Sequence, residues 1–212
     1  MPDGRPRRFV VAPSWRRAAA DYERRIARDG AIETREGNPH DVANALAWLR
    51  FPRTKAALNA VHVRDADATV ANVRSRARDA ATLVDESGLV FACADAGLTA
   101  LLRARRWRDL FWTRRDAVAA RAFPVVIGHG LLEKLREPYR ALTAQALIVD
   151  VAETLHAMER VDTAAAALVA AAEFAPEQLT PLPLAALPGW DCERLGERLF
   201  ADRTVFRDRV LR

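Results

Sequence analysis

The apolar residues of this chain gather in four short runs, and this pattern limits the fold more than any other feature. The runs span residues 81–84 (ATLV), 89–92 (LVFA), 123–127 (FPVVI) and 146–151 (ALIVDV). Such lengths are typical of strands, whereas a membrane-spanning helix needs about 20 predominantly apolar residues. The chain is therefore expected to bury these runs in the core of a soluble protein, with no membrane span.

Two of the runs flank the polar stretch at 85–88 (DESG). A glycine in a short connection between apolar runs indicates a β-hairpin. The run at 123–127 is rich in β-branched residues and predicts a buried strand. The run at 146–151 predicts a further strand, with a helix as the alternative.

The rest of the sequence is mostly helical by its apolar spacing. Helices are predicted from a Ser14 cap through Trp15, Ala18, Tyr22 and Ile26 to Gly30, over 40–50, through Ala56, Leu58 and Val61, over 98–122 with a break near Trp107, over 131–137, and over 153–174. In the helix at 40–50, Val42, Leu46 and Leu49 recur at spacings of four and three, so we expect them to face the core.

These elements predict an α+β fold in a single domain over residues 1–212, predominantly helical, with a β-hairpin and one or two further buried strands. A flexible N-terminus is expected over about residues 1–13. An extended, proline-rich tail packed on the domain is expected over 176–212, because PLPLAALPGW (181–190) has too many prolines for regular structure. No repeat or change of composition marks a second domain.

Composition narrows the cellular setting. The two cysteines, Cys93 and Cys192, are too few for a disulfide framework or a thiolate zinc site. The N-terminal sequence lacks the long apolar region of a secretory signal, so we expect a cytoplasmic location. Of the 33 basic residues, 31 are Arg, and the net charge is only +5. Because Arg titrates at very high pH, the high isoelectric point is weak support for a polyanionic partner.

His129 lies between two glycines, directly after the predicted strand at 123–127 and at the start of a predicted helix. Ligands of α/β arrangements gather beyond the carboxyl ends of strands, and glycines let a backbone approach closely. Glu133 follows four residues later and shares a helix face with His129. The pair is expected to bind a metal or to act as an acid–base couple. A capping histidine beside a solvated glutamate is the alternative.

A second polar group opens the helix at 40–50, where His40 and Asp41 stand together. They are interpreted either as further metal ligands or as a helix N-cap. In the next helix, Lys55, Asn59 and His62 form one polar stripe, which is either part of the same site or a solvated face.

Other candidates carry less weight. Asp85 and Glu86 fall in the predicted hairpin turn, where acidic residues are common for local reasons, so a ligand role is the weaker interpretation. The stretch at 103–115 (RARRWRDLFWTRR) interleaves basic and aromatic residues, as nucleic-acid-binding surfaces do. A core helix with a solvated arginine face is the favoured account of it. The sequence contains neither a phosphate-binding loop nor a nucleophile-elbow motif.

Several strings in order along nearly the whole chain resemble a proteobacterial family of domains of unknown function. They are HDVANALAWLRFPRTKAALNAVH, ATLVDESG, LFWTRR, VIGHGLLEKLREPYRALTAQAL, PLPLAALPGW and VFR. The resemblance implies that one family domain fills the chain, and it implies no activity. Around the His-Asp step the family pattern has bulky aromatics, but here Pro39, Val42 and Ala43 stand, which would loosen a pocket walled by them.

The positions that match the family motifs include most of the polar candidates. They are His40, Asp41, Asn44, Phe51, Pro52, Lys55, Asn59, His62, Asp85, Glu86, Trp112, Gly128, His129, Glu133, Lys134, Pro138, Tyr139, Thr143 and Trp190.

The leading functional hypothesis is a small, metal-assisted, hydrolase-like enzyme. A divalent metal is expected on members of the set His40, Asp41, His129, Glu133 and His62, with an open position for water. The expected catalytic residues are His129, Glu133, Lys55 and Asn59. Lys55 or Lys134 is expected to meet an anionic group of a small ligand.

Two alternatives stay open on the sequence alone. One is a non-catalytic module that binds nucleic acid or another acidic partner through the arginine-rich stretch at 103–115. The other is a structural or interaction protein in which every motif serves the fold.

Overall fold

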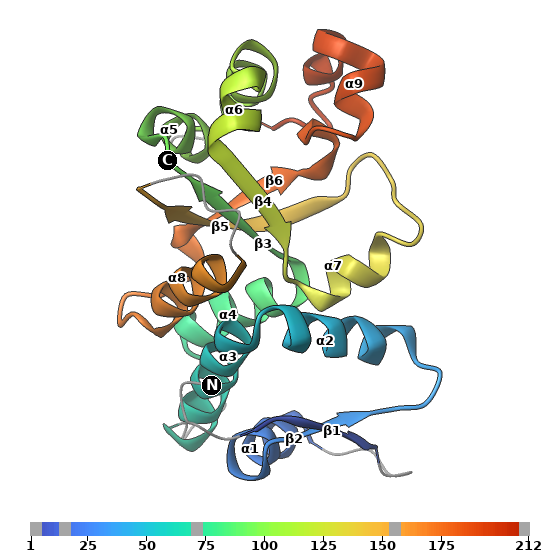
Figure 1. Cartoon of the computed structure of the whole chain (residues 1–212), viewed down its shortest axis with the longest axis vertical. Coiled ribbons are helices and arrows are strands. Elements are labelled where there is room, and N and C mark those ends of the chain that lie inside the picture. The colour runs from blue at the N-terminus through green and yellow to red at the C-terminus, as the bar shows by residue number, and fades with distance from the viewer. Residues whose placement is uncertain (1–5, 13–17, 69–73, 153–157, 208–212) are drawn as a thin grey trace.

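The computed structural model describes residues 6–12, 18–68, 74–152 and 158–207 (Figure 1). The helices are α1 (Ala19–Asp29), α2 (Pro39–Arg50), α3 (Pro52–Ala68), α4 (Arg76–Ser87), α5 (Ala96–Arg103), α6 (Arg115–Arg121), α7 (His129–Lys134), α8 (Met158–Ala170) and α9 (Asp191–Leu195). The strands are β1 (Arg8–Val11), β2 (Ala31–Thr34), β3 (Gly88–Cys93), β4 (Ala122–Val126), β5 (Thr143–Asp150) and β6 (Leu179–Pro183).

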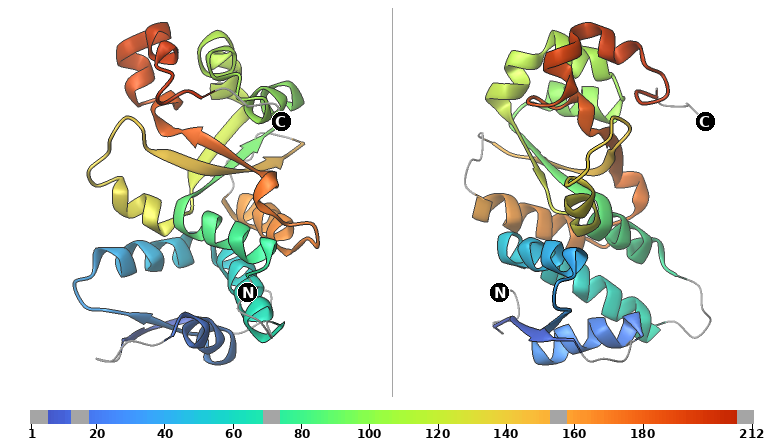
Figure 2. Two further views of the ribbon diagram at one scale, coloured as in Figure 1. Left: turned by 180° about the vertical axis from the view of Figure 1, so that it is seen from behind. Right: turned by 90° about the vertical axis from the view of Figure 1, so that its right-hand side faces the viewer.

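The strands form two separate sheets with α2, α3, α4 and α8 between them, and α5, α6 and α9 lie beyond the larger sheet, at the end far from β1 and β2 (Figures 1 and 2). The larger sheet has the order β4-β3-β5-β6. Its central pair, β3 and β5, is parallel, and each edge strand is antiparallel to its neighbour. The smaller sheet is a parallel pair of β1 and β2. The α+β single-domain fold is confirmed.

Both faces of the larger sheet are covered by apolar side chains, and β3 shows how. Successive side chains of a strand point to opposite faces. Leu89 and Phe91 accordingly belong to a core with the helices of 96–121 and the C-terminal segment, whereas Val90 and Ala92 belong to a core with α3, α4 and α8. All six residues of β3 are buried. The larger sheet is thus a dry, two-sided core.

The predicted β-hairpin is wrong, because residues 81–84 lie in α4. The side chain of Ser75 caps this helix by accepting a hydrogen bond from the Arg78 backbone N–H. Ala80, Ala81 and Val84 are fully buried, and their spacing is that of one helix face. Ala81 and Val84 of the run therefore lie on the inner face of a helix, whereas Leu83 is exposed, and β3 begins only at Gly88.

The inward face predicted for α2 is also wrong. Val42, Leu46 and Leu49 are 51%, 55% and 68% exposed, whereas Ala47 and Trp48 are buried. The small side chain of Ala47 allows α2 to lie close to its neighbours, and Trp48 supplies the buried area. The larger aliphatic residues therefore lie on the outer face.

The prolines of the C-terminal segment did not prevent a strand, contrary to our expectation of irregular structure. β6 pairs antiparallel with β5, with Pro181 opposite Gln145 and Pro183 opposite Thr143. It is an edge strand, and proline is tolerated there because one side of an edge needs no backbone donor. Leu182 of β6 is fully buried.

Several other local predictions are confirmed. Strands are confirmed at β4 and β5, although most of β4 is only half-buried because it lies at the sheet edge. Gly30 ends α1 in the left-handed conformation, with φ of 66°, as expected. The break near Trp107 is confirmed between α5 and the π-helix at Asp109–Thr113.

The structure of the N-terminal region differs from the predictions, as far as this region is described. Residues 8–11, which we expected in a flexible N-terminus, form β1 and pair with the unforeseen strand β2. α1 begins at Ala19, and the predicted cap Ser14 and Trp15 lie outside the described residues. Within the described parts of the chain, no helix has the length and apolar character needed to cross a membrane.

Candidate metal centre

A polar cleft of about 810 Å³ lies where α1, α2 and α3 meet α4 and α7. Its polar and charged lining residues are Tyr22, Glu23, Glu33, Arg35, His40, Asp41, Asn44, Lys55, Asn59, His62, Asp85, Glu86 and His129. The apolar wall includes Ile26, Trp48 and Leu58. Pro39, Val42 and Ala43, where the family pattern has aromatics, are not among the residues that line the cleft.

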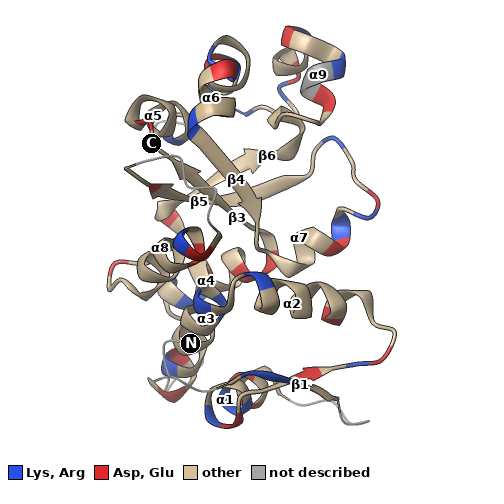
Figure 3. Cartoon of the chain, viewed as in Figure 1, with Lys and Arg blue, Asp and Glu red and all other residues tan. Residues whose placement is uncertain are grey.

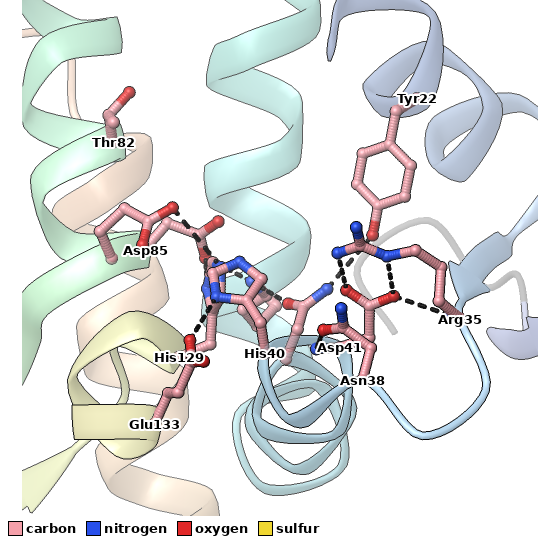
Figure 4. Close-up of polar contacts among 12 residues, drawn as sticks. Tyr22, Arg35, Asn38, His40, Asp41, Thr82, Asp85, His129 and Glu133 are labelled. Atoms are coloured by element: carbon pink, nitrogen blue, oxygen red, sulfur yellow. Dashed lines mark hydrogen bonds and ion pairs between the residues drawn. The ribbon is translucent and has the colours of Figure 1, made fainter. Parts of the chain in front are cut away.

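Two histidines from distant parts of the chain face each other at one side of this cleft (Figure 4). The Nε2 atoms of His40, on α2, and His129, at the start of α7, lie 3.0 Å apart. Their rings meet edge to face, with centroids 4.5 Å apart and planes at 74°. His129 is buried and His40 is half-buried. The convergence expected of His40 and His129 is therefore present in the structure.

A carboxylate completes the group. An Oε1 atom of Glu86, at the end of α4, lies 3.5 Å from the His129 Nε2 atom. One ligand atom each from His40, Glu86 and His129 lies within 4.8 Å of the other two. Two imidazole nitrogens and one carboxylate oxygen form a donor set that suits a divalent transition metal.

Further carboxylates stand behind the two imidazoles. The Nδ1 atom of His40 lies 2.9 Å from Glu133 Oε2 on α7. The Nδ1 atom of His129 has no hydrogen bond among the described residues, and its nearest carboxylate is Asp85 Oδ1 at 3.7 Å. Metal-binding histidines commonly donate their second N–H to a carboxylate, which fixes the ring and leaves the other nitrogen free to bind. Glu133 therefore lies behind a ligand position rather than in it.

The glycines that flank His129 have a packing role. A Cβ atom on Gly128 would lie 2.6 Å from the Ser87 backbone nitrogen, closer than real Cβ atoms approach. A Cβ atom on Gly130 would collide with the Glu86 carboxylate. It would also lie 3.0 Å from the backbone carbonyl oxygen of Glu86. Both glycines thus let the start of α7 lie directly against the end of α4. This close approach brings His129 beside Glu86.

A partly buried hydrogen-bonded chain begins beside His129 at Asp85 and runs along the cleft. The Lys55 ammonium contacts the Asp85 carboxylate and donates to Asn44 Oδ1 at 2.8 Å. Asn44 in turn donates to the Tyr22 hydroxyl at 3.2 Å. Burial alone raises the pKa of the Asp85 carboxyl, but Lys55 and His129 outweigh it, so this pKa lies far below its usual value. Asp85 is therefore a fixed negative charge.

Glu23 of α1 is a separate acidic group in the cleft. Its Oε2 atom accepts a hydrogen bond of 2.6 Å from the Asn59 amide, which also donates to the Glu23 backbone carbonyl at 2.9 Å. Burial, followed by the nearby Asp85 charge, raises the pKa of Glu23 to about 7. Groups with a pKa near neutrality are suited to proton transfer. No motif or spacing in the sequence pointed to Glu23.

Several predicted site residues stand apart from the three donors. Asp41 forms an ion pair with the Arg35 guanidinium and also accepts a hydrogen bond from the Arg35 backbone N–H. These contacts with Arg35 hold the pKa of Asp41 below its usual value. The cap of α2 is Asn38 rather than His40 or Asp41, because its side chain accepts from the Asp41 backbone N–H. His62 lines the cleft outside the group of three, and burial lowers its pKa.

The charge of the cleft differs from what an anionic ligand alone would require. Five carboxylates line it, against the two permanent cations Arg35 and Lys55. Each of these cations is already paired with one of the lining carboxylates. Lys134, the other lysine considered for an anionic group, is exposed on α7 and does not line the cleft. This negative excess favours a cation in the cleft.

The arginine-rich stretch at 103–115 is engaged in internal contacts. Arg103 pairs with Asp150, and Arg108 pairs with Glu197. The Arg115 guanidinium lies 5.2 Å from the centre of the Trp112 ring. Trp107, Leu110 and Phe111 are buried, as expected of a core segment with a charged outer face. Internal pairing reduces the charge that this surface offers to a polyanion.

The sequence matches the model of one protein family over most of its length. The family model for DUF3025, described as a protein of unknown function, matches residues 7–210. The chain therefore belongs to this family. No curated protein and no solved structure matches the chain.

Proposed function

We propose that this protein is a small metal-assisted hydrolase that holds one divalent ion on His40, Glu86 and His129. The observation that carries the proposal is the meeting of two Nε2 atoms at 3.0 Å beside the Glu86 carboxylate. Of the ligands expected from the sequence, His40 and His129 are retained. Glu86 takes the place that was expected for Asp41, His62 or Glu133.

The protonation of the two rings supports a cation between them. The Nδ1 atom of His40 faces Glu133 and that of His129 faces Asp85, so each ring is favoured to carry its proton on Nδ1. Two unprotonated Nε2 atoms at 3.0 Å would then repel each other, unless a positive charge lies between them. A metal ion supplies that charge, and a proton shared by the two rings is the competing explanation.

The donor set favours Zn²⁺ among the common ions. Two imidazoles and one carboxylate are a known ligand set of catalytic zinc sites, which keep a further position open for water. Such an ion lowers the pKa of its bound water towards neutrality and polarises a substrate oxygen. The chain's own contribution is to orient His40 through Glu133 and to keep Asp85 ionised through Lys55.

Within this proposal, Glu23 is the group that takes up and returns the proton during hydrolysis. It lines the same cleft, and its pKa of about 7 suits both directions of transfer. Asn59 orients the Glu23 carboxylate through its amide, and this is the role that the structure supports for the predicted catalytic Asn59. Lys55 acts through Asp85 rather than on substrate.

Metal content of purified protein tests the proposal. Untagged parent protein, His129→Ala, Glu86→Gln and the control His62→Gln would be loaded with Zn²⁺, freed of excess ion and measured by plasma mass spectrometry. We expect about one ion per chain in the parent and in His62→Gln, and a loss in the other two variants. His62 is the matched control because it is a cleft histidine outside the donor group.

Two outcomes would contradict the proposal. Absence of bound metal in the parent would leave a proton shared by His40 and His129 as the account of their contact. Equal metal loss in His62→Gln and His129→Ala would move the binding site away from the three donors. The hydrolase part fails if zinc-loaded parent and Glu86→Gln cleave carboxylic and phosphate esters equally slowly.

A further inference from the structure

A second, smaller cavity adjoins the candidate metal centre. It has a volume of about 200 Å³ and shares five lining residues with the large cleft, four of them polar: Glu23, His62, Asp85 and Glu86. The additional residues that line it are Ala20, Arg74, Arg78 and Thr82, and Ala19 borders both cavities. The two cavities therefore meet beside Glu86, one of the three proposed metal ligands.

The smaller cavity is distinguished by two guanidinium groups. Arg74 donates to the Thr82 hydroxyl at 2.8 Å and has its nearest carboxylate, Asp79, at 3.5 Å. Arg78 donates through Nη1 to Asp65 Oδ2 at 3.1 Å. A guanidinium has five N–H donors, so a single carboxylate leaves several of them for another acceptor.

The Nε atom of Arg78 is an unsatisfied donor. It is buried, and no hydrogen-bond partner reaches it within the described part of the chain. A buried donor without an acceptor costs about 1 to 3 kcal/mol, so such groups are rare and call for an explanation. Arg78 also lines the adjoining cavity, and a small rotation of its guanidinium would turn this donor towards an oxygen atom of a ligand there.

The charges around the junction become favourable to an anion once the metal is bound. The ion neutralises Glu86, and Lys55 already neutralises Asp85. Glu23 is the remaining carboxylate that lines the smaller cavity, and its Oε2 atom accepts a hydrogen bond from the Asn59 amide. The metal ion then faces the same small space as those N–H groups of Arg74 and Arg78 that Asp79 and Asp65 leave open.

We propose that the smaller cavity is a phosphate subsite and that the substrate of the metal centre is a phosphate ester. This inference rests on the proposed metal centre. A phosphate group has enough oxygen atoms to contact the ion and two guanidinium groups together, whereas a carboxylate has only two oxygens. The remainder of the ester occupies the large cleft, whose wall includes Ile26, Trp48 and Leu58.

Titration with inorganic phosphate by calorimetry tests the subsite. The samples would be zinc-loaded parent, Arg74→Gln and Arg78→Lys, with Arg76→Gln as the control. Arg76 lies on α4, like Arg78, but it pairs with Glu177 and does not line the cavity. Arg78→Lys keeps the positive charge next to buried Asp65 while removing the Nε donor and the fork of N–H groups.

We expect phosphate to bind the zinc-loaded parent and to bind each cavity variant at least about tenfold more weakly, with unchanged zinc content. Arg76→Gln should stay within about twofold of the parent. Thermal unfolding followed by circular dichroism would check that each variant is folded.

The outcomes separate this inference from the proposed function. Unchanged phosphate affinity in Arg74→Gln and Arg78→Lys, with zinc still bound, would overturn the subsite and leave the metal centre intact. Lack of phosphate binding by zinc-loaded parent would do the same. Phosphate binding that Arg74→Gln weakens, in a parent that binds no zinc, would support an anion site and contradict the metal centre.

Discussion

The four-stranded sheet and the helical region of α1, α2 and α3 are stabilised in different ways. The sheet has apolar cores on both faces, and β3 and β4 carry no charged residues, as their uniform tan colour shows (Figure 3). α3 shares in the core of the sheet through Leu58 and Val61, but the core between α1, α2 and α3 is a small one of four residues, Ile26, Ile32, Trp48 and Ala56. Its buried polar residues include Glu33, Lys55, Asn59 and Asp65.

This difference indicates that the helical region is packed less stably than the sheet and that the candidate site accounts for it. Buried charges stabilise a fold weakly, because desolvation offsets their attraction, and they are costly when one partner is removed. Local departures from apolar packing are expected at functional sites. The polar cleft lies in the region with the smaller apolar core, while the sheet supplies a rigid support for Glu86 and His129 at its border.

The largest effect is expected from breaking the buried ion pair of the polar region. Lys55→Met should lower the free energy of unfolding by about 3 to 5 kcal/mol, because Asp85 would stay buried without its cation. Lys134→Met is the matched control, since the only other lysine of the chain is exposed, and it should change stability by less than about 0.5 kcal/mol. Urea denaturation measures both. Equal stability of the two variants would contradict the contrast between the regions.

A steric change at the border of the sheet should have the next largest effect. Gly128→Ala places a methyl group against the backbone of Ser87 and Gly88, which should cost about 2 to 3 kcal/mol. In Gly97→Ala, the nearest atom to the new methyl is the tip of the Asp95 side chain at 3.1 Å, so stability should change by less than about 1 kcal/mol. Thermal unfolding measures the pair, and a tolerated Gly128→Ala would show that α4 and α7 can separate freely.

A smaller effect, dependent on pH, should distinguish the polar region further. The pKa of Glu23 is raised to about 7 in the folded protein, so the folded state binds this proton more tightly than the unfolded state. The resulting stability is fully present below about pH 4.5 and is lost as the pH rises through about 7.

Glu23→Gln should therefore be more stable than the parent at pH 8 and nearly equal to it at pH 4. We expect about 1 to 2 kcal/mol at pH 8, less than the roughly 3 kcal/mol implied by an unscreened shift of this size. Denaturation curves of both proteins at the two pH values supply the measurement. If the difference in stability between the two proteins is the same at pH 8 as at pH 4, the pKa of Glu23 is not raised in the folded protein.

The fold class and several elements were predictable because local patterns determine them. Gly30 ends α1, and the apolar run at 146–151, for which a helix was the alternative, lies almost entirely in β5. The hairpin was wrong because the short run 81–84 fits a strand and a helix face equally well. The outer aliphatic face of α2 was unpredictable for another reason, since spacing identifies a face but not which face packs inward.

Two of the three proposed ligands were predicted from the sequence. His129 was singled out by its position between two glycines, and the motif that contains His40 suggested His40 as its partner. Glu86 was misjudged because its assignment depended on the incorrect hairpin, in which it was a turn residue. Once α4 is a helix that ends beside α7, Glu86 lies next to Gly130 and His129. Contacts between residues this far apart in sequence depend on tertiary packing, which local patterns do not encode.

The distribution of the three proposed ligands along the chain has a consequence for unfolding kinetics. Positions 40, 86 and 129 are separated by intervals of 46 and 43 residues. An ion bound to all three would act as a reversible cross-link that closes two long loops and ties α2 to α4 and α7. Opening the helical region would then require release of the ion, so metal loading should slow proteolysis between these segments. A protein nicked between two ligands would stay together until a chelator is added.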